Sequence, residues 1–281
     1  MRNIRFIFFL LFFSFCCSCQ NHAQLAYKVV GTYKGKTAQG MAIYNDTAYI
    51  FSDGGHFRVY DLKSSKVIRE LNLESSANSC HVNSACFGNK FKDNNVPLIY
   101  ITEYQGQRRC FVENIKNDQS ELIQSIKFEM DDDPVFVRNW SVDADNNYIY
   151  ALYTTSMDKK NKKVCNRIAK FHLPDPFEKK DVVLTKIDVI DSFDIYFHNG
   201  IQGGKIKDGY WYISSGLQET ANDKFDSDRA IIVVDLENKK IDRIIDLSLV
   251  SMNEPEDIDF YDDGMLLFCG QTGGLYFLNY K

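Results

Sequence analysis

The sequence predicts an all-β protein, a five-bladed β-propeller closed by an N-terminal strand that completes the last blade. Three observations predict this fold. Short runs rich in Val, Ile, Tyr and Phe alternate with Gly, Asn and Asp along the chain, which is typical of strands joined by tight turns. The strands fall into groups of four, and four antiparallel strands make one propeller blade. The last group lacks a strand, and the N-terminus carries one strand that belongs to no group.

The first unit, residues 39–71, shows the pattern most clearly. It reads GMAIYN, TAYIFSD, HFRVYDL and KVIREL, with turn residues at 45–46, 54–55 and 64–65. Three further units repeat this order. The second reads HVNSACFGN, PLIYITEY, RRCFVENI and ELIQSIKFE; the third reads NWSVDADNN, YIYALYTT, NRIAKFHL and DVVLTKI; the fourth reads IQGGKIKDG, YWYISSG, AIIVVDL and KKIDRIIDL. The loops between units differ in length, which costs little because closure entropy rises slowly with loop length.

The fifth unit decides the architecture. It reads EPEDIDFYDD, GMLLFCGQ and GGLYFLNY, with no fourth strand after it. The segment LAYKVVGTYKG, residues 25–35, is a strand without a unit of its own. Placing it on the outer edge of the last blade closes the ring and covers an exposed strand edge. A β-sandwich, or a six-bladed ring with one blade hidden in a long loop, stays open as an alternative.

The first residues read as an export signal rather than as part of the fold. Arg2 and Arg5 precede an apolar run over residues 6–15. A helix rises about 1.5 Å per residue, so this run reaches only about half of a ~30 Å hydrocarbon core. A basic start followed by a short apolar core and small residues is typical of a secretory signal. We therefore expect a signal peptide over residues 1–18, a short tether over 19–24 and one propeller domain over 25–281.

The residues CCSCQ after the apolar run resemble a bacterial lipoprotein signal, in which a cysteine that follows a small residue is lipid-modified. We expect lipid attachment at Cys19, with Cys17 as the alternative; a signal peptide without a lipid also stays open. A lipid at this position would hold the protein on a membrane of the bacterial envelope without a spanning helix. The sequence leaves open whether the anchored protein lies in the periplasm or on the outer surface, and which membrane leaflet holds the lipid.

Charge and cysteine content narrow the range of partners. The formal net charge is −5, and no concentrated basic patch appears, so we expect no nucleic-acid partner and a monomeric protein. Five scattered cysteines follow the signal, which is not the pattern of a disulfide framework. Cys86 and Cys269 lie in apolar strand patterns and are expected to be small core residues. A single bridge between Cys80 and Cys110 stays open.

Several segments resemble known propeller families. A polar lead-in, an inner strand and a third strand ending in Asp-Leu resemble the superfamily that includes YVTN-type, NHL-type and gluconolactonase-like propellers. The segments AQGMAIYNDTAYIFSDGGHFRVYDLKSSKVIREL and RAIIVVDLENKKIDRIIDLSLV, with EPEDIDFYDDGMLLFCGQTGGLYFLNY, are similar to the five-bladed glutamine cyclotransferase family. With the signal, the chain also resembles propeller lipoproteins of Bacteroides-type bacteria. This likeness implies an exported propeller with its site at the central channel.

Ligands of a propeller usually bind at one mouth of the central channel, beside the residues that lead into each innermost strand. The fold supplies this location, and only the side chains can supply a function. The residues that we expect there, from all five units, are Gln39, His81, Asn83, Asn139, Trp140, His198, Asn199, Gln202 and Glu256. Asp53 and His56, in a turn of the first unit, could reach the same face.

Three interpretations of these residues stay open. His81, His198 and Glu256 could hold a divalent cation. Trp140 and the amides could instead grip a small organic ligand, although Trp140 could equally pack between blades. The polar side chains could also bind one another and water, since buried polar groups need partners. We expect no cofactor and no metal, because no phosphate loop, G-x-S-x-G elbow or H-E-x-x-H motif is present.

Two classes of function follow. The first is a non-catalytic binding or scaffold propeller for a sugar, a peptide or a protein partner. The alternative is a propeller hydrolase or cyclotransferase-like enzyme with its site at the channel mouth. The expected residues include no evident nucleophile paired with a base, which favours binding without turnover.

Overall fold

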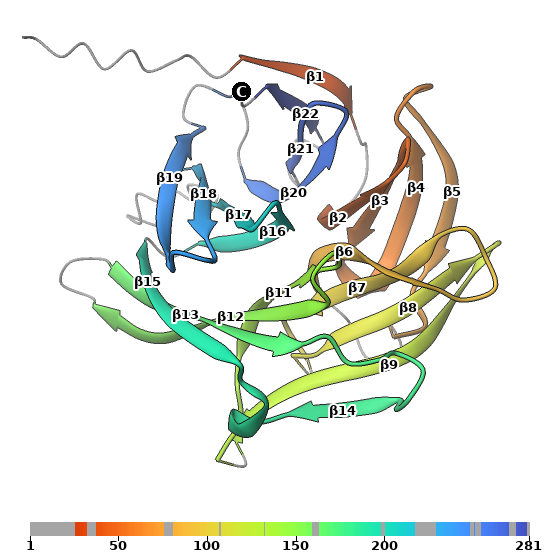
Figure 1. Ribbon diagram of the computed structural model, residues 1–281. Coiled ribbons are helices and arrows are strands. Elements are labelled where there is room, and N and C mark those ends of the chain that lie inside the picture. The colour runs from red at the N-terminus through yellow and green to blue at the C-terminus, as the bar shows by residue number, and fades with distance from the viewer. Residues whose placement is uncertain are drawn as a thin grey trace, which may run out of the picture.

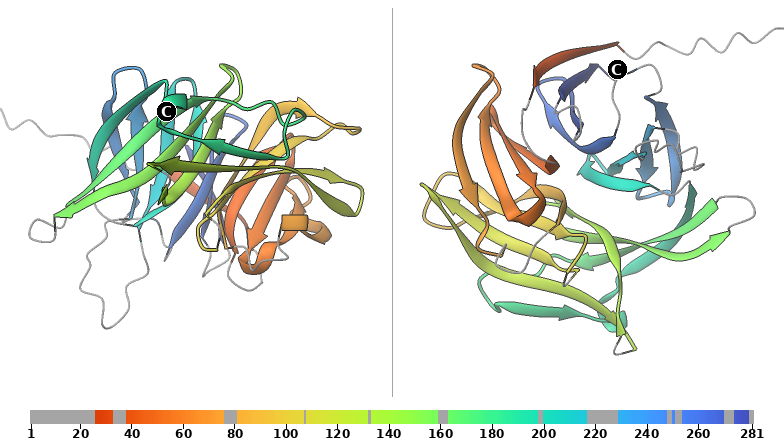
Figure 2. Two further views of the ribbon diagram at one scale, coloured as in Figure 1. Left: turned by 90° about the horizontal axis from the view of Figure 1, so that it is seen from below. Right: turned by 180° about the vertical axis from the view of Figure 1, so that it is seen from behind.

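The computed structural model describes residues 26–32, 38–75, 81–106, 108–131, 133–158, 163–197, 200–216, 229–247, 250, 254–269 and 274–279. Their strands form five antiparallel sheets set as blades around a common axis (Figure 1). Figure 2 shows the same ring from the side and from behind. The predicted all-β, five-bladed propeller is therefore confirmed. Within these ranges, no helix is long and apolar enough to cross a membrane.

Each blade carries four strands, ordered from the channel outward. Blade one holds β2 (Ala38–Tyr44), β3 (Thr47–Ser52), β4 (His56–Asp61) and β5 (Lys66–Asn72). Blade two holds β6 (Val82–Phe91), β7 (Pro97–Glu103), β8 (Cys110–Lys116) and β9 (Gln119–Met130). Blade three holds β11 (Val137–Asp143), β12 (Tyr148–Asp158), β13 (Lys163–His172) and β15 (Asp191–Phe197). Blade four holds β16 (Ile201–Lys207), β17 (Tyr210–Ser215), β18 (Ala230–Asp235) and β19 (Lys240–Asp246).

Blade five is built from both ends of the described chain. It holds β20 (Pro255–Tyr261), β21 (Gly264–Cys269), β22 (Gly274–Asn279) and, at its outer edge, β1 (Ala26–Thr32). The N-terminal strand β1 runs antiparallel to β22, from the pair Ala26 and Asn279 to the pair Thr32 and Gly274. That the ring depends on this strand to stay closed remains a prediction.

One predicted strand is present but belongs to another blade. The segment DVVLTKI was assigned to the outer edge of blade three, but its strand β14 (Asp181–Leu184) pairs in parallel with β9 of blade two. After it, the short 3₁₀ turn η3 (Lys186–Asp188) leads the chain back, and β15 becomes the outer strand of blade three. The two-residue strand β10 (Asp133–Pro134) adds a further short pairing to β9. Blade two is therefore wider than a four-stranded unit, and Figure 1 shows β14 beside β9.

Five separate hydrophobic clusters fill the spaces between neighbouring blades. They arise because successive side chains of a strand point to opposite faces of the sheet. In β12, for example, Ile149 and Ala151 pack toward blade two, while Tyr150 and Leu152 pack toward blade four. The alternation that predicts strands thus also divides each blade between two cores.

The cysteines of the described residues are packing residues. Cys86, Cys110 and Cys165 are buried free thiols, and Cys86 lies in the cluster between blades two and three, as predicted. Burial raises the pKa of the Cys86 thiol, and it raises that of Cys110 further. Cys80 and the Cys269 side chain lie outside the described part of the chain.

Candidate functional site

A cavity of about 310 Å³ opens where the five innermost strands begin. Every blade contributes to its wall, because each inner strand starts at the same end of the channel. The lining residues are Gln39, His81, Asn83, Tyr104, Gln105, Arg138, Gly200, Ile201, Gln202 and Glu254. Of the residues expected at the channel mouth, the structure thus brings Gln39, His81, Asn83 and Gln202 together around one cavity.

His81 is held in place by blade one. Its Nδ1 lies 2.5 Å from Oδ1 of Asp53, which opens the short 3₁₀ turn η1 (Asp53–Gly55) between β3 and β4. The His81 ring also lies 5.7 Å from the ring of Tyr104, centroid to centroid. A carboxylate on one ring nitrogen fixes the orientation of an imidazole and leaves the other nitrogen for a ligand. His56, which was also expected to reach this face, lies instead 3.5 Å from Glu70.

Arg138 is the cationic group of the cavity wall. Its Nη1 lies 3.4 Å from the Tyr104 hydroxyl, and its guanidinium carbon lies 5.6 Å from the centre of the Phe136 ring. Arg108 stacks over the same Phe136 ring at 4.0 Å but does not line the cavity. Aromatic contacts of this kind hold a guanidinium in one orientation.

Polar side chains at the mouth also tie neighbouring blades together. Asn83 Nδ2 donates to the carbonyl of Arg138 (3.0 Å), which joins blades two and three. Asn139 Nδ2 donates to the carbonyl of Gln202 (3.1 Å), which joins blades three and four. Gln202 Nε2 donates to Glu254 Oε1 (2.8 Å), which reaches the start of blade five. Asn83 and Asn139 thus bond to backbone carbonyls of the next blade, and Gln202 bonds to another polar side chain.

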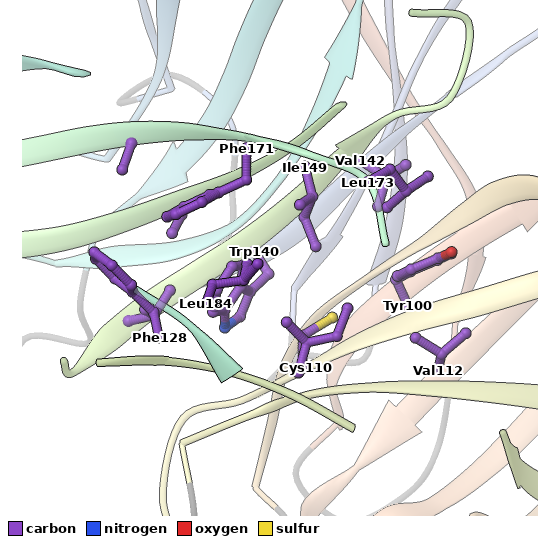
Figure 3. Close-up of a cluster of buried hydrophobic side chains, with 14 of the residues drawn as sticks. Tyr100, Cys110, Val112, Phe128, Trp140, Val142, Ile149, Phe171, Leu173 and Leu184 are labelled. Atoms are coloured by element: carbon purple, nitrogen blue, oxygen red, sulfur yellow. The ribbon is translucent and has the colours of Figure 1, made fainter. Parts of the chain in front are cut away.

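Three of the expected residues do not line the cavity. Asn139 is fully buried, while Trp140 is 1% exposed and packs between blades two and three, close to Phe171 (Figure 3). The stacking interpretation of Trp140 is wrong, because it lies on the strand face that meets blade two. Glu256 is 2% exposed, and the acidic residue at the mouth is Glu254, just before β20.

The remaining expected residues, His198, Asn199 and Cys19, lie outside the described residues. The metal interpretation that joins His81, His198 and Glu256 therefore stays a prediction. Within the ranges that the structure describes, no group of three or more His, Cys, Asp or Glu side chains could hold a metal ion.

Deeper along the inner strands, Asp257 crosses from blade five to two other blades. Its Oδ2 accepts hydrogen bonds from the backbone N–H of Met41 (2.8 Å) and of Ala85 (3.2 Å). A side chain at Gly203 would collide with it, because an added Cβ would lie 2.0 Å from Oδ1. Burial raises the pKa of Asp257 well above its usual range, although the backbone donors oppose this shift. Asp257 therefore contacts the inner strands of blades one, two and four from blade five.

Asp259 repeats this arrangement two residues further along β20. Its Oδ2 accepts from the backbone N–H of Ile43 (2.7 Å) and lies 3.6 Å from Nζ of Lys205. Burial raises its pKa, and the nearby Lys205 ammonium opposes that shift. Since alternate positions of a strand share one face, both carboxylates reach the inner strand of blade one, where Met41 and Ile43 donate to them.

Sequence reasoning missed several wall residues. Arg138 directly precedes the expected Asn139, so a window one residue wider would have included it. Tyr104 and Gln105 come from the far end of β7, and their place at the mouth follows from the β6–β7 pairing rather than from a lead-in position. No local pattern in the sequence marks them.

A second cavity, of about 640 Å³, lies at the outer β8–β9 turn. Apart from Glu74, its lining residues all come from one short segment, positions 114 and 116–121. It lacks the convergence of separate elements and the positioned cation that characterise the channel mouth. We therefore take the smaller cavity as the candidate site.

Comparison with known proteins supports the fold and nothing finer. No protein-family model matches the chain, and no curated protein matches it in sequence. The crystal structure of Myxococcus xanthus glutaminyl cyclase is similar at TM-score 0.52 and 10% identity, over 90% of this chain and 96% of that one. The β-propeller domain of Myceliophteria thermophila Cps50 (Swd1) matches at TM-score 0.42 and 10% identity, over 87% and 84%. The Neurospora crassa Pan2 WD40 domain matches at TM-score 0.37 and 10% identity, over 86% and 62%.

Proposed function

We propose that this protein is a binding module that takes a small polar ligand, a sugar or a peptide fragment, at the mouth of its central channel. The observation that carries the proposal is the cavity to which all five blades contribute. Its wall combines amides, an imidazole, a guanidinium and a carboxylate. Concave sites with a few convergent polar groups are the usual places for small ligands.

Binding without turnover is the better-supported role. Among the described residues that line the cavity, none is Ser, Thr or Cys, so the hydroxyl and thiol nucleophiles of common hydrolases are not found in this wall. The only acid in that wall, Glu254, is hydrogen-bonded to Gln202 and is not matched by a second lining carboxylate. A protein partner that inserts a polar side chain would use the same cavity.

Calorimetric titration tests the proposal directly. The wild-type protein would be titrated with a panel of neutral and acidic monosaccharides and dipeptides. The variant His81→Ala removes a lining group, whereas His56→Ala removes an imidazole outside the cavity and is the matched control. We expect His81→Ala to weaken binding by about tenfold or more, since a hydrogen bond to a charged group contributes about 1.5–3 kcal/mol. A panel without any binder, or equal affinities for the two variants, contradicts the proposal.

We further propose that the mature protein begins at Cys19 and is anchored to the bacterial envelope through a lipid on that residue. The sequence before the tether supports this, as the order of basic, apolar and small residues precedes a cysteine. Labelling of cells with a fatty-acid analogue should mark the wild-type protein and should be lost in Cys19→Ala. The control Cys17→Ala should keep the label, and the opposite result would move the attachment to Cys17.

A second function is favoured by one contact. Asp53 orients His81 in a way that also suits a general base, since a carboxylate on Nδ1 leaves Nε2 to accept a proton. Because the fold is similar to that of a glutaminyl cyclase, cyclisation of a glutaminyl peptide is the reaction to test first. Turnover that His81→Ala and Asp53→Asn both abolish would establish the enzyme and displace the binding role.

A further inference from the structure

Arg138 differs in its partners from the four described arginines that pair with an acid. Arg58, Arg109, Arg167 and Arg243 each form an ion pair with an Asp or Glu. No carboxylate of the described residues lies within ion-pair distance of Arg138, and its buried Nε has no hydrogen-bond partner there. Its cation is therefore held by aromatic contacts and not neutralised by a counter-ion.

Because Arg138 lines the cavity, its positive charge is available to a bound ligand. A guanidinium is planar and presents paired N–H groups that match a carboxylate in a two-point contact. The adjacent Tyr104 hydroxyl lies 3.4 Å from Nη1 and adds another donor to the same corner. The protein as a whole carries a net charge of −5, so one unneutralised cation in a recess is a local exception.

Other groups around the cavity limit the charge of the ligand. Glu254 lines the same cavity, and the Asp53 carboxylate stands directly behind His81. Two carboxylates near one recess repel a doubly charged phosphate more strongly than a singly charged group. The amides of Gln39 and Gln105 and the imidazole of His81 suit hydroxyl and amide groups on the rest of the ligand.

We propose that the ligand of the channel mouth carries a carboxylate, which Arg138 binds in a two-point contact. This inference rests on the proposed binding function and specifies it. Either an acidic sugar or the C-terminal end of a short peptide supplies the same carboxylate chemistry. Both classes have a size that suits a cavity of about 310 Å³.

The test compares matched pairs of ligands that differ in one charge. Methyl glucuronide is paired with methyl glucoside, and an acetylated dipeptide acid is paired with its C-terminal amide. Each is titrated calorimetrically into the wild type, Arg138→Gln and Arg108→Gln. Arg108→Gln is the matched control, because Arg108 contacts the same Phe136 ring but does not line the cavity.

We expect the acid of at least one pair to bind the wild type about tenfold or more tightly than its neutral counterpart, since a charge-assisted two-point contact is lost in the neutral ligand. Arg138→Gln should abolish this preference, and Arg108→Gln should keep it. The pair that shows the preference identifies the source of the carboxylate.

Three results would overturn the inference. Neutral ligands that bind the wild type as tightly as acids would reject the carboxylate while leaving the binding function in place. If Arg138→Gln and Arg108→Gln lose the preference for the acidic ligand equally, the preference comes from the overall positive charge near the cavity rather than from a contact with Arg138. Failure of every ligand to bind at millimolar concentration would reject both the inference and the proposed function. The comparison on the wild type needs no variant, so it decides the question even if Arg138→Gln does not fold.

Discussion

Acidic side chains of this propeller have opposite roles at different depths. Asp257 is fully buried, and its hydrogen-bond donors among the described residues are backbone N–H groups. Asp194 lies on the outer strand β15, where Arg167 binds it through two hydrogen bonds of 2.7 and 2.9 Å. The pKa of Asp257 is raised by burial, whereas the Arg167 hydrogen bond holds the pKa of Asp194 below its usual range. Substitutions of Asp257 and Asp194 should therefore change the free energy of unfolding by different amounts and with a different dependence on pH.

Replacing Asp257 should be strongly destabilising. Asp257→Ala leaves the N–H groups of Met41 and Ala85 without their acceptor, and each buried unsatisfied donor costs about 1–3 kcal/mol. We expect the free energy of unfolding to fall by about 3 kcal/mol in urea denaturation. The control Asp242→Ala, beside Arg243 on β19, should change it by about 0.5 kcal/mol or less. Similar values for both variants would show that the axial carboxylate does not hold the inner strands together.

The stability that the Arg167–Asp194 pair contributes should be lost in acid. A carboxylate whose folded-state pKa is lowered stabilises the fold above its unfolded pKa of about 3.9, and this contribution is lost as the pH falls through the folded-state pKa. Asp194→Asn should cost about 0.3–1 kcal/mol near pH 7, because the pair is about one-third exposed. The difference in the free energy of unfolding between wild type and variant should be smaller at about pH 3 than at about pH 5. Urea titrations at the two pH values provide the check, and an unchanged difference would contradict this account.

At the scale of single elements, the alternation of apolar and polar residues predicts where strands lie, but it does not predict which strand each one pairs with. The inner and middle strands are predicted because their apolar positions alternate and Asn or Asp marks the turns, as at Asn45 and Asp208, whose φ angles are both 52°. The pairing of β14 is not predicted, since VVL forms a strand equally well on blade three or blade two. The open edge of the long strand β9 and the turn η3 decide the outcome, and both depend on tertiary contacts.

The buried side of β14 should contribute measurably to stability. Leu184 is 7% exposed and packs into the cluster between blades two and three, whereas the next residue back, Val183, is 43% exposed. Leu184→Ala should lower the free energy of unfolding by about 2–4 kcal/mol, because a buried leucine loses both transfer energy and packing. Val183→Ala should cost about 0.5 kcal/mol or less. Denaturant melts of the two variants provide the check, and equal effects would place β14 away from the core.

At the scale of the whole molecule, the seam between blades five and one combines a small hydrophobic cluster with several hydrogen bonds. Among the described residues its hydrophobic cluster holds six buried side chains, fewer than any of the other four. Three hydrogen bonds also cross this seam: the backbone N–H groups of Met41 and Ile43 donate to Asp257 and Asp259, and the Tyr261 hydroxyl donates to Asp46. Because hydrogen bonds are directional, they help to fix the relative position of these two blades, whose shared hydrophobic cluster is small.

The same scale explains how much of the site the sequence predicts. The location at the channel mouth follows from ring geometry, and Gln39, His81, Asn83 and Gln202 are found there. The direction of Trp140 does not follow, because a shift of one residue along β11 turns a side chain from the channel into the core. Arg138 and Tyr104 meet only after blades two and three have packed, so no segment of sequence predicts their contact.

The N-terminal strand β1 provides the last prediction. Removing residues 1–32 would delete β1 and leave the outer edge of β22 unpaired, with its backbone N–H and C=O groups open to other chains. We expect this truncation to melt at a clearly lower temperature and to form aggregates in size-exclusion chromatography. A protein that lacks only residues 1–24 keeps β1 and is the matched control, expected to melt as the mature protein does. If both truncations stay monomeric and melt together, the ring is held by the bonds of Asp257 and Asp259 across the seam rather than by its N-terminal strand.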